Sequence, residues 1–227
     1  MTLEFIIPFI VSYLLISVGF YIFQKINYKN FYKNNFLLRN TFLFETHNFN
    51  SGSNLILRIW YPLFSIIEVV PFIVFFASKG INYTVHFHLL VASILLLVSI
   101  LFKILLFFTK TLNIKFFVSE YVIRMLSLLG SILFLIIGIM TTISENYALY
   151  QDNQVTFYVF FVMYIVLLIA CISCLFNSKF FNWYNFEKDE NEQIKKPKTI
   201  YFALYQWIFD YSEVIFVILT TVFMYYL

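Results

Sequence analysis

Six long apolar stretches, separated by shorter polar ones, set the pattern of this 227-residue chain. Each stretch has about 20 residues or more, the length that an α-helix needs to cross a hydrocarbon core of roughly 30 Å. The pattern therefore predicts an all-α integral membrane protein, a bundle of about six transmembrane helices in a single membrane domain over residues 1–227. The expected spans are residues 3–24, 57–78, 83–108, 117–142, 155–176 and 200–227.

The polar segments between these stretches predict the topology. Residues 25–56 form the longest early loop and the most basic one, and residues 177–198 form the most polar loop. A short basic link follows the third stretch, whereas the loop after the fourth is mildly acidic. Because basic loops stay preferentially on one side of a membrane, both termini are expected on the side opposite to them. Within the second stretch, Pro62 and Pro71 are expected to bend the helix.

Composition excludes a soluble protein. Hydrophobic residues make up 62% of the chain and charged residues only 12%, where about 25% is usual for soluble domains. The net charge of +3 is small and scattered, so no nucleic-acid partner is expected. The 31 phenylalanines and 17 tyrosines indicate an A+T-rich gene, of the kind that organelles and some low-GC bacteria carry. The expected partners are the lipid bilayer and other membrane subunits.

Ionisable residues inside the apolar stretches are the candidate functional residues. A charge in a spanning helix is costly and usually faces water, a partner charge or another subunit. Glu120 and Arg124 are four positions apart, so they share one helix face and can pair. They form either a structural ion pair near the membrane interface or a polar link in a proton path or subunit contact. In both cases we expect them to face protein rather than lipid.

Three further residues complete the candidate set. Glu68 has no basic residue one helical turn away, so its carboxyl group is expected to be protonated, to pair with another helix or to face water. Glu213 lies in the last stretch with Asp210 one turn before it. Both can line one face, although Asp210 could simply reach the interface. Gly130, at the centre of the fourth stretch, permits either close helix packing or a change of winding.

Histidine and cysteine do not form a recognisable cofactor site. His86 and His88 are two positions apart, on nearly opposite sides of a helix, and cannot both ligate one haem iron. Cys171 and Cys174 form a single CxxC inside an apolar stretch and are expected to serve packing. We expect no catalytic residue, no metal site and no cofactor bound by this chain, so the sequence does not support an enzyme that acts on its own.

Short motifs in two stretches carry a family resemblance. The fourth stretch opens with Ser119-Glu120-Tyr121, continues through Leu128-Leu129-Gly130-Ser131-Ile132 and closes near Ile139-Met140. The last stretch has Leu204-Tyr205 and then Tyr211-Ser212-Glu213 before an aliphatic run. These segments, and the order of loop lengths from the second stretch onward, resemble subunit 6 of NADH dehydrogenase, the respiratory complex I. The chain departs from that family in its extra N-terminal helix and in lacking the tyrosine of the glycine motif.

The resemblance implies a divergent, organelle-encoded membrane-arm subunit of the proton-pumping NADH:ubiquinone oxidoreductase, in the mitochondrial inner membrane. Such a subunit helps couple quinone reduction to proton translocation, while NADH, FMN, iron–sulfur clusters and ubiquinone bind to other subunits. It also implies that Glu120 and Glu213 order or gate water and that the helix around Gly130 changes its winding. Two alternatives stay open: a protein similar to subunit 3 of cytochrome c oxidase, and a six-helix permease or accessory protein of a low-GC bacterial plasma membrane.

Overall fold

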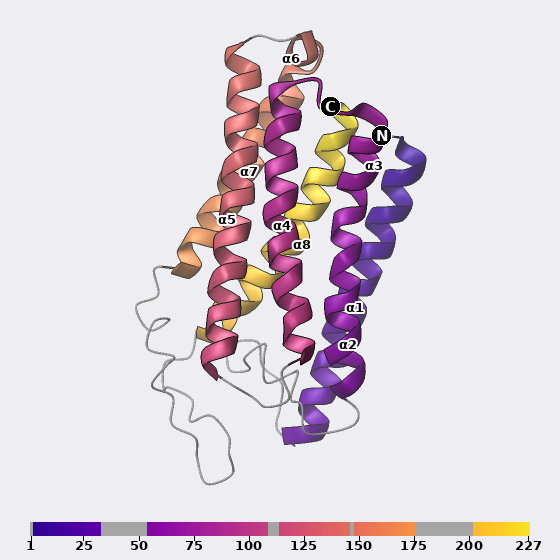
Figure 1. Cartoon of the computed structure of the whole chain (residues 1–227), viewed down its shortest axis with the longest axis vertical. Coiled ribbons are helices and arrows are strands. Elements are labelled where there is room, and N and C mark those ends of the chain that lie inside the picture. The colour runs from indigo at the N-terminus through magenta and orange to yellow at the C-terminus, as the bar shows by residue number, and fades with distance from the viewer. Residues whose placement is uncertain (1, 33–53, 109–113, 146–147, 176–201) are drawn as a thin grey trace.

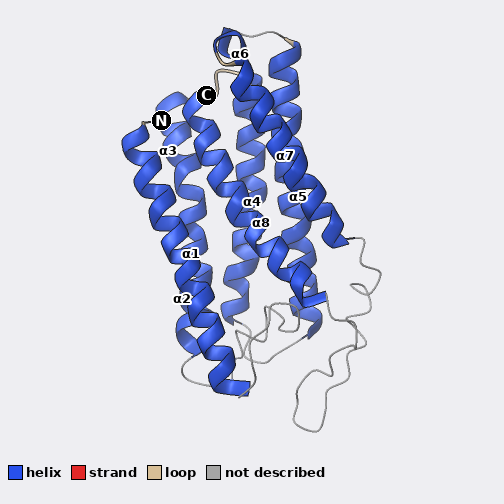
Figure 2. Cartoon of the chain, turned by 180° about the vertical axis from the view of Figure 1, so that it is seen from behind, coloured by secondary structure: helices blue, strands red, loops and turns tan. Residues whose placement is uncertain are grey.

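The computed structural model describes residues 2–32, 54–108, 114–145, 148–175 and 202–227. Within these ranges the chain folds into a bundle of long helices that run side by side, and no strand is present (Figures 1 and 2). Six helical segments of the described chain are long and apolar enough to cross a membrane. The predicted fold, an all-α membrane bundle of about six spans, is confirmed. The helices are α1 (Leu3–Tyr32), α2 (Asn54–Ser65), η2 (Ile66–Val69), α3 (Val70–Lys79), α4 (Thr84–Phe108), α5 (Ile114–Ser144), α6 (Ala148–Asp152), α7 (Gln154–Leu175) and α8 (Phe202–Tyr226).

The second span is interrupted near its middle, as its prolines predict. Pro71 lies in the first turn of α3 and has no N–H to offer the carbonyl group of Ile67, four residues earlier. The N–H of Val70 bonds to that carbonyl instead, and the chain tightens into the short 3₁₀ helix η2. Glu68 lies in this irregular turn, half-way along the span.

Two predicted loop boundaries need correction. Residues 25–32 continue α1: this segment contains no proline or glycine to end the helix, and its lysines can extend toward water. The part of the 25–56 loop between residues 33 and 53 lies outside the described residues, and so does the whole of the 177–198 loop. The segment after α5, expected to be an acidic loop, contains the short helix α6.

Both termini lie at one end of the bundle (Figure 1). At the opposite end, called the loop end below, α1, α4 and α7 finish and α2, α5 and α8 begin. The turn that joins α3 to α4 lies at the terminal end and contains Gly80, whose φ of 65° suits glycine. Because both termini lie at the same end, the chain crosses the membrane an even number of times.

Helices α5 and α8 form the centre of the bundle. In the most apolar stretch of α8, 61% of residues are buried, against 11% in α1. α4 and α5 approach closely because small residues lie between them: a Cβ atom at Gly138 would be 2.8 Å from His88 Cβ, and Ser131 donates a hydrogen bond of 3.0 Å to the carbonyl of Ala92. Small residues play this part widely in membrane helices.

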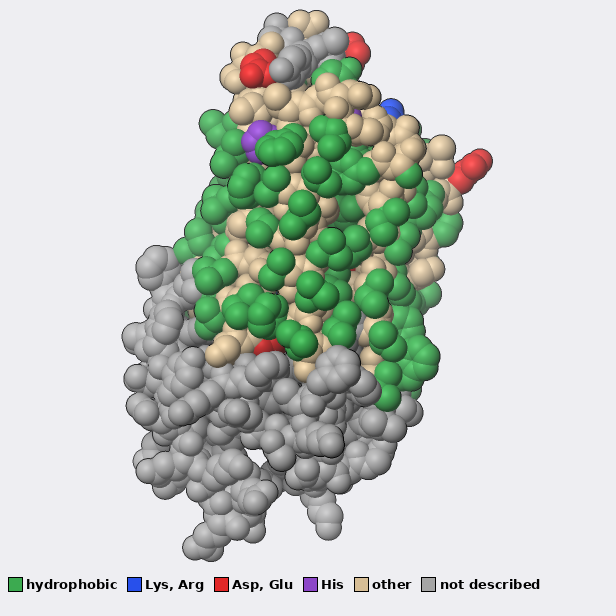
Figure 3. Space-filling model, viewed as in Figure 1, with side chains coloured by type: hydrophobic (Ala, Val, Ile, Leu, Met, Phe, Trp, Pro, Cys, Tyr) green, Lys and Arg blue, Asp and Glu red, His purple; other side chains and the backbone are tan. Residues whose placement is uncertain are grey.

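Hydrophobic side chains dominate the described part of the face seen in Figure 3. The side of α1 that faces away from the bundle consists of large hydrophobic side chains, among them Leu15, which is 67% exposed. Such a surface is unfavourable in water and suits lipid. α1 thus contacts the other helices with one face and leaves the other for the bilayer.

Candidate functional site

Six ionisable side chains from four spans meet inside the bundle, at the level between its middle and the loop end. All six are almost completely shielded, with residue exposures of 9% or less. They are connected by five ion pairs, each 3.3 Å or shorter. The members of this charged network are Glu68 (η2), Lys103 (α4), Glu120 and Arg124 (α5), and Asp210 and Glu213 (α8).

Glu213 is the centre of the charged network. One of its oxygens, Oε2, lies 2.9 Å from Lys103 Nζ and also accepts a hydrogen bond from Arg124 Nη2. The other, Oε1, accepts a bond of 2.6 Å from the Ser99 hydroxyl. A carboxylate in a low-dielectric interior needs its lone pairs satisfied, and Glu213 receives donors from both α4 and α5.

Arg124 spreads its guanidinium group over three acids. Nη1 lies 3.3 Å from Glu120 one turn earlier on α5, and Nη2 reaches Asp210 at 3.0 Å as well as Glu213. Its flat side lies over Phe209, 5.6 Å from the ring centre. The planar fork of arginine carries several N–H donors in fixed directions, so different nitrogens of one side chain can contact different carboxylates.

Lys103 joins Glu68 to the rest of the charged network. Its Nζ atom lies 3.0 Å from Glu68 Oε1 and 2.9 Å from Glu213. Helical side chains slant toward the N-terminus of their own helix, and that end of α4 lies across the membrane from the loop end. The amine is therefore directed into the bilayer core, not out toward the nearby loop end, and ion pairing offsets part of its desolvation.

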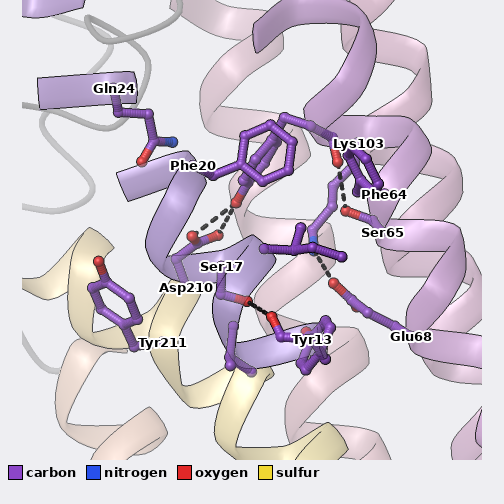
Figure 4. A pocket seen from close by; sticks show the side chains of 13 residues that line it. Tyr13, Ser17, Phe20, Gln24, Phe64, Ser65, Glu68, Lys103, Asp210 and Tyr211 are labelled. Atoms are coloured by element: carbon purple, nitrogen blue, oxygen red, sulfur yellow. Dashed lines mark hydrogen bonds and ion pairs between the residues drawn. The ribbon is translucent and has the colours of Figure 1, made fainter. Parts of the chain in front are cut away.

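A tyrosine couples the charged network to α2. The Tyr61 hydroxyl lies 2.7 and 2.8 Å from the two carboxylate oxygens of Asp210 and donates to that group. Lys103 Nζ lies over the same tyrosine, 5.7 Å from the ring centre. Lys103 and Asp210 are labelled among the neighbouring side chains in Figure 4.

The charged network holds more acids than bases. Four carboxyl groups face two cations, so the fully ionised set has two uncompensated negative charges. Excess charge of one sign in a low-dielectric interior is unfavourable. The arrangement therefore favours taking up positive charge, as protons or small cations, and its acid–base alternation offers successive positions for a proton.

Most of the acids that the sequence singles out meet in the charged network. The pair of Glu120 and Arg124 is confirmed, and both side chains face protein: their residue exposures are 4% and 2%. Of the three expectations for Glu68, pairing with another helix is the one that the structure bears out. Asp210 and Glu213 line one face of α8, and Asp210 contacts Arg124, so it does more than reach an interface.

Sequence reasoning missed three members or partners of the site. The most important of them is Lys103, which the sequence could have revealed, because it is a charged residue within the long, mainly apolar helix α4. Ser99 lies one turn before it on the same face. Tyr61 carried no signal, because tyrosines are frequent in this chain, with 17 in total.

Gly130 lies apart from the charged network. A Cβ atom there would be 2.9 Å from Leu95 Cδ1 of α4, so the glycine allows α4 and α5 to approach. α5 is a continuous α-helix from Ile114 to Ser144, with no bulge at this position. The close-packing interpretation of Gly130 is the one that this structure supports.

The described residues contain no group of three or more His, Cys, Asp and Glu residues arranged to hold a metal ion. His86 packs against Phe75 of α3, while His88 packs against Gly138 of α5, so the two histidines face different helices, as their spacing predicts. Cys171 and Cys174 are both buried and free, and Cys174 donates to the carbonyl of Ala170, 3.3 Å away.

Comparisons with family models, curated proteins and solved structures found no match to this chain. Its function must therefore be argued from the charged network and from the motifs in the sequence.

Proposed function

We propose that this chain is a membrane subunit of a respiratory NADH dehydrogenase and that its charged network carries protons through part of the bilayer. The observation on which the proposal depends is the position of Glu213, a buried carboxylate held by Lys103 on one side and Arg124 on the other. The subunit would act in the mitochondrial inner membrane, beside the subunits that reduce quinone, and would bind no redox cofactor itself.

The chemistry of the charged network suits proton movement. A relay needs groups that exchange protons over hydrogen-bond distances, and Glu68, Lys103 and Glu213 follow one another at separations of 3.0 Å or less. Arg124 keeps its charge and would hold Glu213 in place rather than pass on a proton. Intramembrane ionisable groups that face each other within a bundle commonly mark ion pathways. A purely structural network would need as many cations as anions to be most stable, whereas this one has two acids in excess.

The assignment to NADH dehydrogenase draws on the motifs that resemble its subunit 6. The two acids in those motifs, Glu120 and Glu213, come from different helices and both contact Arg124. Two acids that act in the same coupling step are expected to lie close together in the folded protein. The proposal does not use a change of winding at Gly130.

The first test identifies the proteins that are associated with this chain in its native membrane. The chain is tagged in its native membranes, extracted in mild detergent and identified with its partners after native electrophoresis. Migration with NADH dehydrogenase subunits is the expected result. Migration with haem–copper subunits would support the alternative of a cytochrome c oxidase subunit, and migration alone would support the permease; either outcome contradicts the proposal.

The second test addresses the charged network. Glu213→Gln keeps the shape of the side chain and removes its negative charge, so we expect assembly to persist and proton translocation per electron to fall at least tenfold. Glu145→Gln is the matched control, because Glu145 is exposed just beyond the end of α5. Unchanged proton translocation in assembled Glu213→Gln protein would exclude the relay.

A permease has one observation in its favour, a pocket with charged walls beside the charged network. A transported solute would need this pocket to open in turn to both sides of the membrane. Uptake of a solute into vesicles that contain the purified chain alone would favour this function.

A further inference from the structure

A pocket lies between α1 and the charged network. The volume open to water inside it is about 40 Å³, enough for a few water molecules. Charged walls come from Glu68, Lys103 and Asp210, and the facing wall is α1 (Figure 4). The residues of α1 that line it are Tyr13, Ile16, Ser17, Phe20 and Gln24, which recur at helical spacing on one face.

Three polar atoms on the walls of this pocket lack a hydrogen-bond partner within the described structure. They are the Tyr13 hydroxyl, Gln24 Nε2 and Glu68 Oε2. Their residues are at most 4% exposed, and a buried polar group without a partner costs about 1–3 kcal/mol. Because the three include donors and acceptors, they suit a small molecule that can both give and accept hydrogen bonds. Water has this property, and it binds in sites that offer it two to four polar partners.

The pocket extends from the middle of the membrane toward the loop end. Tyr13 and Gln24 are separated by 11 positions of α1, a rise of about 16 Å, which is roughly half of the hydrocarbon core. Gln24 is the member nearer the loop end, and Tyr13 lies deeper, on the same level as Glu68 in Figure 4. The polar lining therefore covers one half of a crossing.

Beyond Glu68, the side of the pocket that α3 and α4 form is lined mainly by apolar side chains. The helices α3 and α4 fill the bundle there with Phe72, Phe75, Leu89 and Leu96, each with an exposure of 1% or less. The next buried ionisable side chain on this path within the described residues is His86, near the terminal end of α4. Tightly packed apolar side chains exclude water, so we do not expect water in the pocket to pass Glu68 between α3 and α4.

We propose that this pocket is a hydrated half-channel, which admits water and small cations from the loop end as far as Glu68 and the charged network. α1 forms its outer wall, and the excess of carboxyl groups makes it selective for positive charge. The inference deepens the proposed function, because such a half-channel would supply protons to the relay. It assigns α1, the helix that the resembled family lacks, the role of sealing the channel from lipid.

Cysteine accessibility tests the half-channel. Ser17 is replaced by cysteine in the full chain, in its native membrane, after Cys171→Ala and Cys174→Ala have removed the natural thiols. Cysteine suits this site because the Ser17 hydroxyl bonds only to the carbonyl of Tyr13 in its own helix, 2.8 Å away. Val18→Cys is the matched control: Val18 is the next residue on α1 but is 54% exposed on the lipid side. Gln24→Cys probes the outer part of the same pocket.

Membrane-impermeant methanethiosulfonate reagents are then added to sealed vesicles, one carrying a trimethylammonium group and the other a sulfonate. The thiolate is the reactive form and needs water, so Ser17→Cys should react at least about tenfold faster than Val18→Cys. The reaction should occur only from the side opposite to the termini. Gln24→Cys should react faster than Ser17→Cys, and the cationic reagent should exceed the anionic one by about tenfold.

Equal rates for Ser17→Cys and Val18→Cys, or reaction of Ser17→Cys from the terminal side, would overturn the half-channel. Labelling does not depend on proton pumping, so the outcome is separate from that of Glu213→Gln. A labelled pocket with unchanged proton translocation in Glu213→Gln would leave the half-channel standing and exclude the relay. An unlabelled pocket together with lost proton translocation in Glu213→Gln would support the relay and exclude the half-channel.

Discussion

At the scale of residues, Lys103 does the most to set the charge of the site. Without its amine, Glu68 would have no cation within the distances of the described ion pairs, and Glu213 would keep only Arg124. Glu68, in contrast, could be neutralised and still leave Lys103 paired with Glu213. The two partners of this ion pair are therefore not equivalent.

This asymmetry predicts the result of a double-mutant cycle. Lys103→Met should lower the free energy of unfolding by about 3–5 kcal/mol, because it strands buried negative charge. Glu68→Gln should cost less, about 1–3 kcal/mol. The double variant should be more stable than the sum of the two losses indicates, with a coupling of about 0.5–3 kcal/mol.

The measurement is denaturation of the purified variants in mild detergent. Lys79→Met, at the exposed end of α3, is the control and should change stability by less than about 0.5 kcal/mol. Strict additivity of the two substitutions would mean that the pair is close in space but not coupled in energy.

At the scale of elements, the contact between α4 and α5 depends on two glycines in different ways. A Cβ atom at Gly130 would meet the mobile end of Leu95, at 2.9 Å, whereas one at Gly138 would meet Cβ of His88, at 2.8 Å. A terminal methyl group can turn away, but a Cβ atom moves only with its backbone. Gly138 is therefore the tighter point of this interface.

Alanine substitutions should separate the two positions. Gly138→Ala should destabilise the protein by about 1–3 kcal/mol, the usual cost of overpacking. Gly130→Ala should be close to neutral, because Leu95 can change rotamer and alanine favours the helix. Thermal denaturation of the two variants in detergent compares them directly; a larger loss at Gly130 would contradict the packing described here and revive a special role for that residue.

At the scale of the whole molecule, the bundle has two unlike ends. The polar pocket lies on the loop-end side of the bundle's middle, whereas α3 and α4 pack mainly apolar side chains on the terminal side of Glu68. The basic residues Lys25 and Lys29, in the last turns of α1, also lie toward the loop end. An asymmetric molecule of this kind needs one fixed orientation in the membrane.

Topology mapping tests that requirement. Epitope tags at the two termini should show the same protease sensitivity in sealed vesicles, because both termini lie at one end of the bundle. They should be on the side opposite to the basic segments, which the positive-inside rule places on the cytoplasmic or matrix face. Digestion of one tag with protection of the other would contradict the six-span fold.

The sequence by itself determined the membrane class, the number of spans and the acids that matter, because the length of an apolar run and the cost of a charge within it are local properties. Pro71 likewise marked the interruption that holds Glu68. Only the tertiary structure decided which charges meet. Glu68 and Lys103 are 35 positions apart and Arg124 and Glu213 are 89 apart, so their pairing depends on how the helices pack and on the direction in which each side chain slants. The same holds for the pocket, which exists only because α1 covers the charged network while its sequence offers an apolar helix with a few polar side chains.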